Sequence, residues 1–150
     1  MKIIDTAAAL TALQSLTEEG HTVSVTVSGN SMAPFLRHGR DVVWFRKPDR
    51  PLKAGDIVFF RRPSGQFVLH RICRICPDGY MIVGDNQTVP EGPVPPAQIF
   101  ALVVQVRRKG RMLTPKHLLW RFFAVVWVRM IFARKAIGAV HGRLHRRKER

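Results

Sequence analysis

Cysteine is scarce in this chain of 150 residues, which contains only Cys73 and Cys76. Two cysteines do not make a disulfide framework, and a structural zinc site would need a second pair of ligands. In a strand, their spacing would place the two side chains on opposite faces, which opposes both a shared disulfide and shared metal ligation. We therefore expect ordinary reduced cysteines, and no metal or other cofactor.

Acidic residues are also few. Lys and Arg number 25 against 10 Asp and Glu, so the formal net charge is +15. The excess is concentrated in residues 107–150, where Glu149 is the only acid. This balance indicates an anionic partner, either nucleic acid or an anionic membrane face.

Long uncharged apolar runs are missing. Residues 1–4 are followed at once by Asp5, so the pattern of a secretory signal peptide is not present. Residues 118–133 are mostly apolar, but the run is shorter than the roughly 20 residues that span a bilayer and contains Arg121 and Arg129. We expect a helix lying in the membrane interface, or alternatively one packed on the body of the protein or on a second copy. The side chains expected to face lipid are Trp120, Phe123, Trp127 and Ile131.

The rest of the chain has the pattern of a mainly β protein. Residues 6–18 favour a helix that ends at Gly20. Alternating or β-branched runs predict strands at 21–28, 41–46, 56–61, 66–72, 80–83 and 99–106. Four prolines predict that 87–97 is irregular. The expected organisation is an N-terminal helix (1–20), a β-domain (21–114), an apolar and basic helix (115–141) and a basic tail (142–150).

Ser31 stands just after the first predicted strand, in the sequence Ser-Gly-Asn-Ser-Met-Ala-Pro. Gly29 lets the backbone bend and Pro34 fixes the exit of the turn, so the serine is lifted to the surface of the sheet as a candidate nucleophile. Gly-Asn-Ser is also ordinary turn chemistry, so this motif alone leaves both interpretations open.

His70 lies in an apolar predicted strand, where a polar ring needs a partner. It is either a structural histidine or the base that takes a proton from Ser31 and returns it to the leaving amine. The ordinary pKa of histidine suits that work near neutral pH.

Four short motifs stand in order along the chain: Ser-Gly-Asn-Ser-Met-x-Pro-x-Leu (28–36), Gly-Asp-Ile-Val (55–58), His-Arg-Ile (70–72) and Gly-Asp-Asn (84–86). Together they resemble the signal peptidase I and SOS-repressor peptidase superfamily, over about residues 20–106. Bacterial signal peptidases and self-cleaving repressors use a Ser–Lys dyad. A histidine at the base position resembles the archaeal and endoplasmic-reticulum signal peptidases. The resemblance implies a small β-domain of coiled antiparallel sheets, no metal, and cleavage of a peptide bond near small residues.

The resemblance also implies an acid that orients His70, in or shortly after the Gly-Asp-Asn motif. Asp85 is favoured because a short carboxylate after a glycine is held tightly, although it could instead cap its own turn. Glu91, near the later acidic position, is the alternative. For the oxyanion, the backbone N–H of Ser31 is available and Asn30 is a candidate side-chain donor. Met32 is expected in the wall of the substrate cleft or in the core.

These observations favour a serine endopeptidase that cuts a leader or signal segment from a peptide or protein. Its expected location is cytoplasmic or peripheral at an anionic membrane surface, because no membrane anchor precedes the β-domain. The alternative is an inactive module of the same fold that binds extended peptides or nucleic acid. Nucleic acid is the less favoured partner, since residues 1–20 are too short for a helix-turn-helix domain and interleaved aromatic residues are not obvious in the body.

Overall fold

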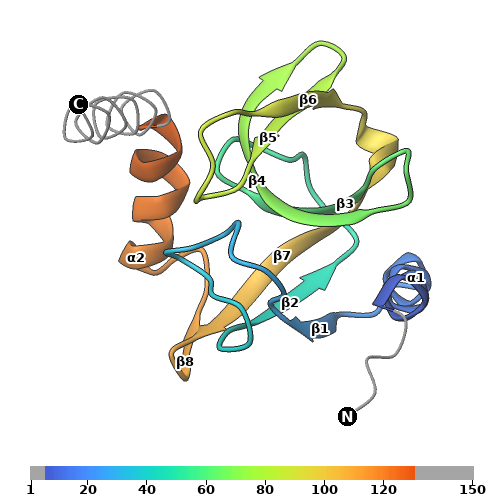
Figure 1. Cartoon of the computed structure of the whole chain (residues 1–150), viewed down its shortest axis with the longest axis horizontal. Helices are drawn as coiled ribbons and strands as arrows, with labels where there is room; N and C mark the ends of the chain where they lie inside the picture. The colour runs from blue at the N-terminus through green and yellow to red at the C-terminus, as the bar shows by residue number, and fades with distance from the viewer. Residues whose placement is uncertain (1–5, 131–150) are drawn as a thin grey trace, which may run out of the picture.

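The computed structural model describes residues 6–130, which form one eight-stranded antiparallel sheet flanked by a helix at each end of the chain (Figure 1). The strand order is β1-β2-β7-β3-β4-β5-β6, and β8 pairs with β7. The strands are β1 (Val23–Thr26), β2 (Val42–Arg46), β3 (Ile57–Arg61), β4 (Phe67–Cys76), β5 (Gly79–Val83), β6 (Glu91–Val94), β7 (Ile99–Arg108) and β8 (Arg111–Leu113). This arrangement confirms the predicted mainly β fold with a helix near each terminus.

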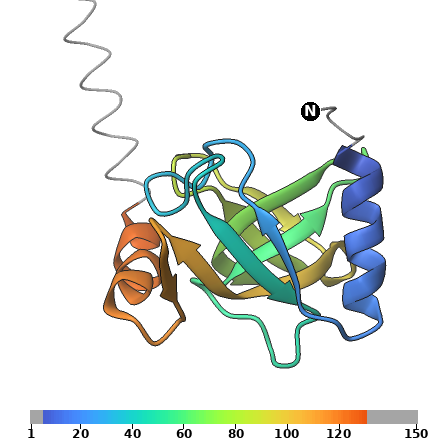
Figure 2. The ribbon, with the colours of Figure 1, turned by 90° about the horizontal axis from the view of Figure 1, so that it is seen from below.

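The sheet is strongly coiled (Figure 2). Its central strand β3 is buried on both faces. Ile57 and Phe59 point into the larger apolar cluster, whereas Val58 and Phe60 point into a smaller one. Because successive side chains of a strand point to opposite faces, a strand between two cores needs an unbroken apolar run. The sequence Ile-Val-Phe-Phe meets this requirement.

Helix α1 (Thr6–Glu18) confirms the predicted N-terminal helix and packs Leu13 against the larger cluster. Its end is a Schellman motif. Gly20, with φ of 92°, donates to the carbonyl of Thr17 at 3.0 Å, and His21 donates to that of Leu16 at 3.0 Å. The helix therefore ends at the glycine that the sequence indicates.

The proline-rich segment 87–97 contains more regular structure than predicted. Strand β6 and a 3₁₀ helix, η1 (Pro96–Gln98), lie largely within it. Strand β6 is at the end of the sheet and pairs with β5, so one of its sides needs no partner strand. An edge strand tolerates Pro93, which lacks an N–H donor, and the prediction of an irregular segment is wrong for this reason.

The C-terminal segment lies against the β-domain as helix α2 (Leu118–Arg121), which continues as a π-helical stretch, η2 (Phe122–Trp127). Trp120 and Phe123 are buried against Phe35, with ring centroids 5.7 and 4.9 Å away. The expectation that these two rings face lipid is therefore wrong, because Phe35 belongs to the larger cluster, which they help to close.

Two further expectations concern this segment. Between residues 6 and 130, no helix is long and apolar enough to cross a membrane. Ile131, the rest of the predicted helix and the basic tail 142–150 lie outside the described residues.

Candidate active site

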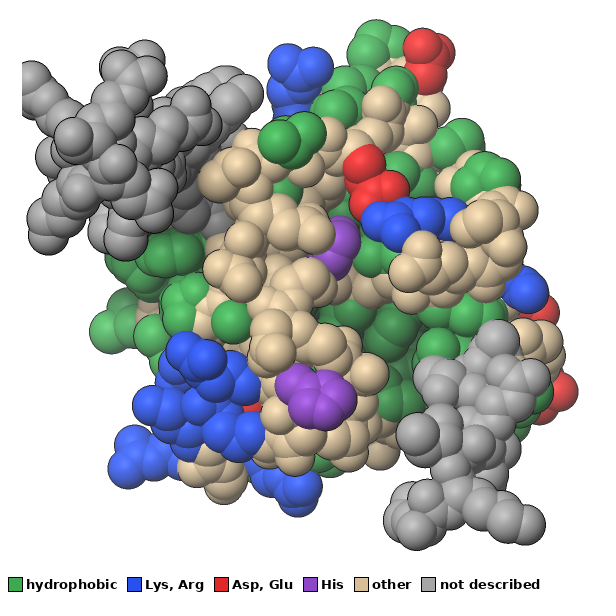
Figure 3. Space-filling model, in the orientation of Figure 1, with side chains coloured by type: hydrophobic (Ala, Val, Ile, Leu, Met, Phe, Trp, Pro, Cys, Tyr) green, Lys and Arg blue, Asp and Glu red, His purple; other side chains and the backbone are tan. Residues whose placement is uncertain are grey.

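Ser31 and His70 line the same pocket, which has a volume of about 270 Å³. Ser31 comes from the loop between β1 and β2, and His70 from the middle of β4, where it is paired in register with Val58 of β3. Figure 3 looks onto this side of the sheet, where histidine, acidic and basic side chains lie together near the centre of the view. The side chains of Ser31 and His70 are not hydrogen-bonded to each other among the described residues.

The turn that carries Ser31 is stabilised by the left-handed backbone conformation of a glycine and by buried side chains of the turn itself. Gly29 has φ of 81°, and its N–H donates to Nδ1 of His38 at 2.8 Å. Met32 and Leu36 are fully buried, and the N–H of Leu36 donates to the carbonyl of Met32 at 2.9 Å. Within the described part of the chain no acceptor takes the N–H of Ser31.

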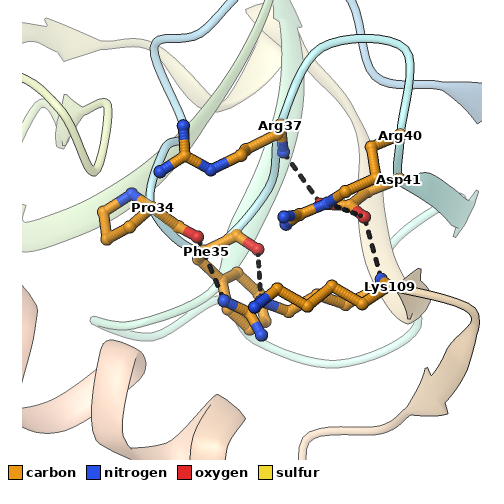
Figure 4. Close-up of polar contacts among 7 residues, drawn as sticks. Pro34, Phe35, Arg37, Arg40, Asp41 and Lys109 are labelled. Carbon is orange, nitrogen blue, oxygen red and sulfur yellow. Dashed lines mark hydrogen bonds and ion pairs between the residues drawn. The ribbon is translucent and has the colours of Figure 1, made fainter.

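The far side of the same loop is fixed by strand β7 (Figure 4). Arg108 donates from Nε to the carbonyl of Phe35 at 2.7 Å and from Nη2 to that of Pro34 at 3.2 Å. These bonds tie the exit of the serine turn to the C-terminal end of β7.

Asp41 closes this loop from a fully buried position. Its carboxylate accepts from the backbone N–H of Arg37 at 2.8 Å and of Lys109 at 3.1 Å, and from the guanidinium of Arg40 at 2.8 Å (Figure 4). Burial alone would raise the pKa of Asp41, but these hydrogen bonds outweigh it and lower the pKa overall. A carboxylate held in this way keeps its charge and makes the loop rigid.

His70 is a buried imidazole whose Nδ1 lacks a hydrogen bond. Its side chain is 5% exposed, and Nδ1 has no hydrogen-bond partner. Burial lowers the pKa of His70 from 6.5 to about 4; Glu91 opposes this shift and Arg62 adds to it. At neutral pH the ring is therefore uncharged and can accept a proton, which a catalytic base must do.

Glu91 is the carboxylate beside His70. Its Oε1 lies 3.8 Å from Nδ1 of His70, and Arg62 holds both of its oxygens, with Nε at 3.0 Å from Oε2 and Nη2 at 2.6 Å from Oε1. Arg62 also donates to Gln66 at 2.6 Å. The sequence carried no signal for Arg62, since a single cation at the start of a hairpin has no distinctive pattern.

Asp85, the favoured orienting acid, lies elsewhere. It is 1% exposed, and Arg71 binds it through Nε and Nη2, both at 2.8 Å. Asp85 does not meet His70 because successive side chains of β4 point to opposite faces, so His70 and Arg71 lie on different sides of the strand. Arg71 is in register with Val83 of β5, two residues before Asp85, so the acid meets the arginine. The preference for Asp85 over Glu91 is thereby corrected.

The Gly-Asp-Asn motif instead supports the serine turn. The N–H of Asn86 donates to the carbonyl of Ser31 at 2.9 Å. A Cβ on Gly84 would lie 2.5 Å from the same oxygen, so only glycine permits this approach. The motif therefore fixes the backbone of the candidate nucleophile.

The remaining predicted site residues divide as follows. Met32 both lines the pocket and belongs to the core. Asn30 is exposed and does not line the pocket, so the structure does not bring it to the site. Cys73 and Cys76 are not joined by a disulfide, and among residues 6–130 no three His, Cys, Asp or Glu side chains gather closely enough to hold a metal ion.

In the coiled antiparallel sheet, the serine-bearing turn and β4 line one pocket. Residues 3–104 match the family described as Peptidase S24-like. Because this match covers more than half of the chain, the protein belongs to that family. No curated protein and no solved structure gives a match to the chain. The matched residues include the whole pocket, whereas α2 and η2 follow them.

Proposed function

We propose that this S24-like protein is a serine endopeptidase that cuts a leader or signal segment from a peptide or protein. Ser31 is the nucleophile and His70 the general base. The observation that carries the proposal is the shared pocket, in which a serine on a rigid turn stands with a buried histidine that is neutral at pH 7. In this proposal the histidine at the base position resembles that of the Ser–His signal peptidases.

The reaction follows from these groups. As Ser31 Oγ forms a bond to the scissile carbonyl carbon, its proton passes to His70, and the carbonyl electrons move to the oxygen. The free N–H of Ser31 is a donor for that oxyanion. His70 then gives the proton to the leaving amine as the C–N bond breaks. Water, deprotonated by His70, cleaves the acyl-enzyme and restores both side chains.

Glu91 is the third member in this proposal. An orienting acid holds the imidazole in one tautomer and stabilises the imidazolium that forms during attack. The 3.8 Å separation of Glu91 Oε1 and His70 Nδ1 is longer than a hydrogen bond. Catalytic hydrogen bonds are often long before substrate binds, and Arg62 holds the carboxylate of Glu91 beside the His70 nitrogen that lacks a partner.

The test is cleavage of a diverse peptide mixture by the purified protein, read by mass spectrometry. Ser31→Ala and His70→Ala should each abolish every cleavage that the wild type makes, because the two residues act as a unit. Ser64→Ala in the exposed β3–β4 hairpin and His21→Ala after α1 are matched controls and should keep wild-type activity. Cleavage that persists in Ser31→Ala would contradict the assignment, and binding of peptides without any cleavage would favour the inactive module.

We also propose that the enzyme works at an anionic membrane surface, on which the outer face of the C-terminal helix lies. That face exposes the apolar side chains of Leu118, Phe122, Val125, Val126 and Met130. In Figure 3 hydrophobic side chains gather over this helix, at the left of the view. A soluble monomer rarely leaves such a stripe uncovered.

Charge beside the stripe indicates which surface covers it. The hollow between the helix and the β2–β3 loop is lined by four basic side chains (Arg50, Lys53, Lys116 and Arg121) against one acid, Asp56, which is already paired with Arg50. Phosphate headgroups complement this charge, and the apolar stripe complements the acyl boundary below them.

Vesicle sedimentation tests the membrane proposal. The full chain should bind phosphatidylcholine vesicles that contain phosphatidylglycerol, and high salt should weaken the binding only in part, since screening spares the apolar contribution. The triple variant Leu118→Gln/Phe122→Gln/Val126→Gln should lose binding. Ile75→Gln/Val89→Gln, which alters exposed apolar residues away from the helix, should keep it. Self-association through the stripe without vesicle binding would contradict the proposal in favour of a second copy as the occupant.

A further inference from the structure

The C-terminal helix reaches the serine turn through a hydrogen bond. Nε1 of Trp127 donates to the backbone carbonyl of Asp85 at 2.8 Å. The next N–H, that of Asn86, donates to the carbonyl of Ser31 at 2.9 Å. The carbonyl of Asp85 and the N–H of Asn86 belong to one planar peptide group. The indole and the backbone of Ser31 are therefore joined through a single amide, in which each hydrogen bond polarises the other.

This amide is the point at which the Gly-Asp-Asn loop is held against the serine. On one side the loop is anchored by the buried pair of Asp85 and Arg71. At Gly84 it packs so close to Ser31 that no Cβ would fit. These contacts bring the loop near the serine turn. The orientation of the Asp85–Asn86 peptide group depends in addition on a hydrogen-bond donor to the carbonyl of Asp85. Trp127 supplies that partner.

Packing of the helix on the β-domain holds the indole of Trp127 in position. The backbone of the helix lies directly on Gly55, where an added Cβ would be 2.6 Å from the carbonyl of Ala124. The ring of Phe123 packs on Phe35 and, at 5.5 Å between centroids, on Trp127 itself. All the helical residues involved lie beyond residue 104, where the family match ends. The contact is thus made by a part of this chain that the matched peptidase region does not include.

We infer that Trp127 is a positioning residue for the nucleophile: its indole N–H orients the Asp85–Asn86 peptide group, which in turn fixes the backbone of Ser31. The inference rests on the proposed role of Ser31. It makes the C-terminal helix a part of the working active site as well as a candidate membrane contact.

The experiment compares Trp127→Phe with Trp120→Phe in the full chain. The first keeps an aromatic ring but removes the donor to Asp85. The second makes the same substitution on the same helix, at a ring that packs on Phe35 and, among the described residues, makes no hydrogen bond to the loop. The measured quantity is the second-order rate constant for acylation of Ser31 by a small fluorophosphonate, well below the unfolding temperature of each protein. Trp127→Phe should react about tenfold more slowly than wild type, as loss of one hydrogen bond predicts, and Trp120→Phe within about twofold.

A second readout separates positioning from stability. With a cleaved peptide, Trp127→Phe should lower kcat and leave KM unchanged, because the pocket that binds the peptide is intact. If Trp127→Phe does not fold, benzothienylalanine at position 127, which replaces the indole N–H by sulfur, provides the same comparison.

The outcomes are distinct. Wild-type acylation rates in Trp127→Phe, or equal slowing in both variants, would overturn the positioning role and leave the peptidase proposal standing. A wild-type protein that does not react at Ser31 would overturn the nucleophile assignment, and the positioning role with it.

Discussion

Acidifying the solution from pH 7 to pH 5 should leave most of the peptidase activity intact. His70 must be neutral to accept the proton of Ser31, and burial lowers its pKa to about 4. With that pKa about 90% of His70 is neutral at pH 5, whereas with the ordinary value only about 3% would be. At pH 5 the fraction of His70 that is neutral should therefore be roughly 30-fold larger than for an exposed histidine.

The assay is the pH dependence of kcat/KM or of the acylation rate constant, and two variants test its cause. Glu91 raises the pKa of His70 and Arg62 lowers it. Glu91→Gln should move the acidic limb of the profile to lower pH, and Arg62→Gln should move it to higher pH. A wild-type limb at the ordinary pKa of histidine, or two variants that move the limb in the same direction, would refute the reasoning.

The same buried ring makes the fold sensitive to acid. In the unfolded chain His70 takes up a proton below pH 6.5, whereas in the folded chain it does so only near pH 4. Between these values the unfolded state binds more protons, so stability falls as the pH falls, by about 3 kcal/mol at most. Urea unfolding at pH 7 and pH 4 should show this extra loss in the wild type and not in His70→Leu. An equal pH dependence in the two proteins would contradict it.

Two further predictions concern the support of the serine turn. Gly84→Ala would push a methyl group into the carbonyl of Ser31, and it should cost about 1–3 kcal/mol in urea unfolding and slow acylation of Ser31; unchanged acylation would show that the close approach does not matter. Arg71→Met would remove the guanidinium that binds the buried carboxylate of Asp85 and should cost about 3–5 kcal/mol, much of it recovered in Arg71→Met/Asp85→Leu. Additive losses in that double-mutant cycle would argue against the pair.

Local patterns predicted most of the fold. The structure of β3 follows from its unbroken apolar run, and the end of α1 follows from the glycine after it. Both depend on residues close together in the sequence, so the sequence alone indicates them. Strand β6 was missed because its prolines are tolerated only at a sheet edge, and the position of an edge depends on the order of strands far apart in the sequence.

In the candidate site, too, local motifs predicted some residues, whereas others depend on strands far apart in the sequence. Ser31 and His70 stood out through their motifs, but the choice between Asp85 and Glu91 depends on which face of β4 each acid meets. That choice is set by the register of β4 with β5, and no local pattern contains it. The inward direction of Trp120 likewise depends on Phe35, which lies 85 positions earlier in the chain.

Covalent labelling tests the central claim most directly. The full chain is treated with a fluorophosphonate, and intact-mass and peptide-mapping mass spectrometry locate the adduct. One phosphonyl group on Ser31 is expected in the wild type, none in Ser31→Ala, and a greatly slowed reaction in His70→Ala, because the serine is activated by that base. An unlabelled wild type, or a label on another residue that persists in Ser31→Ala, would contradict the account.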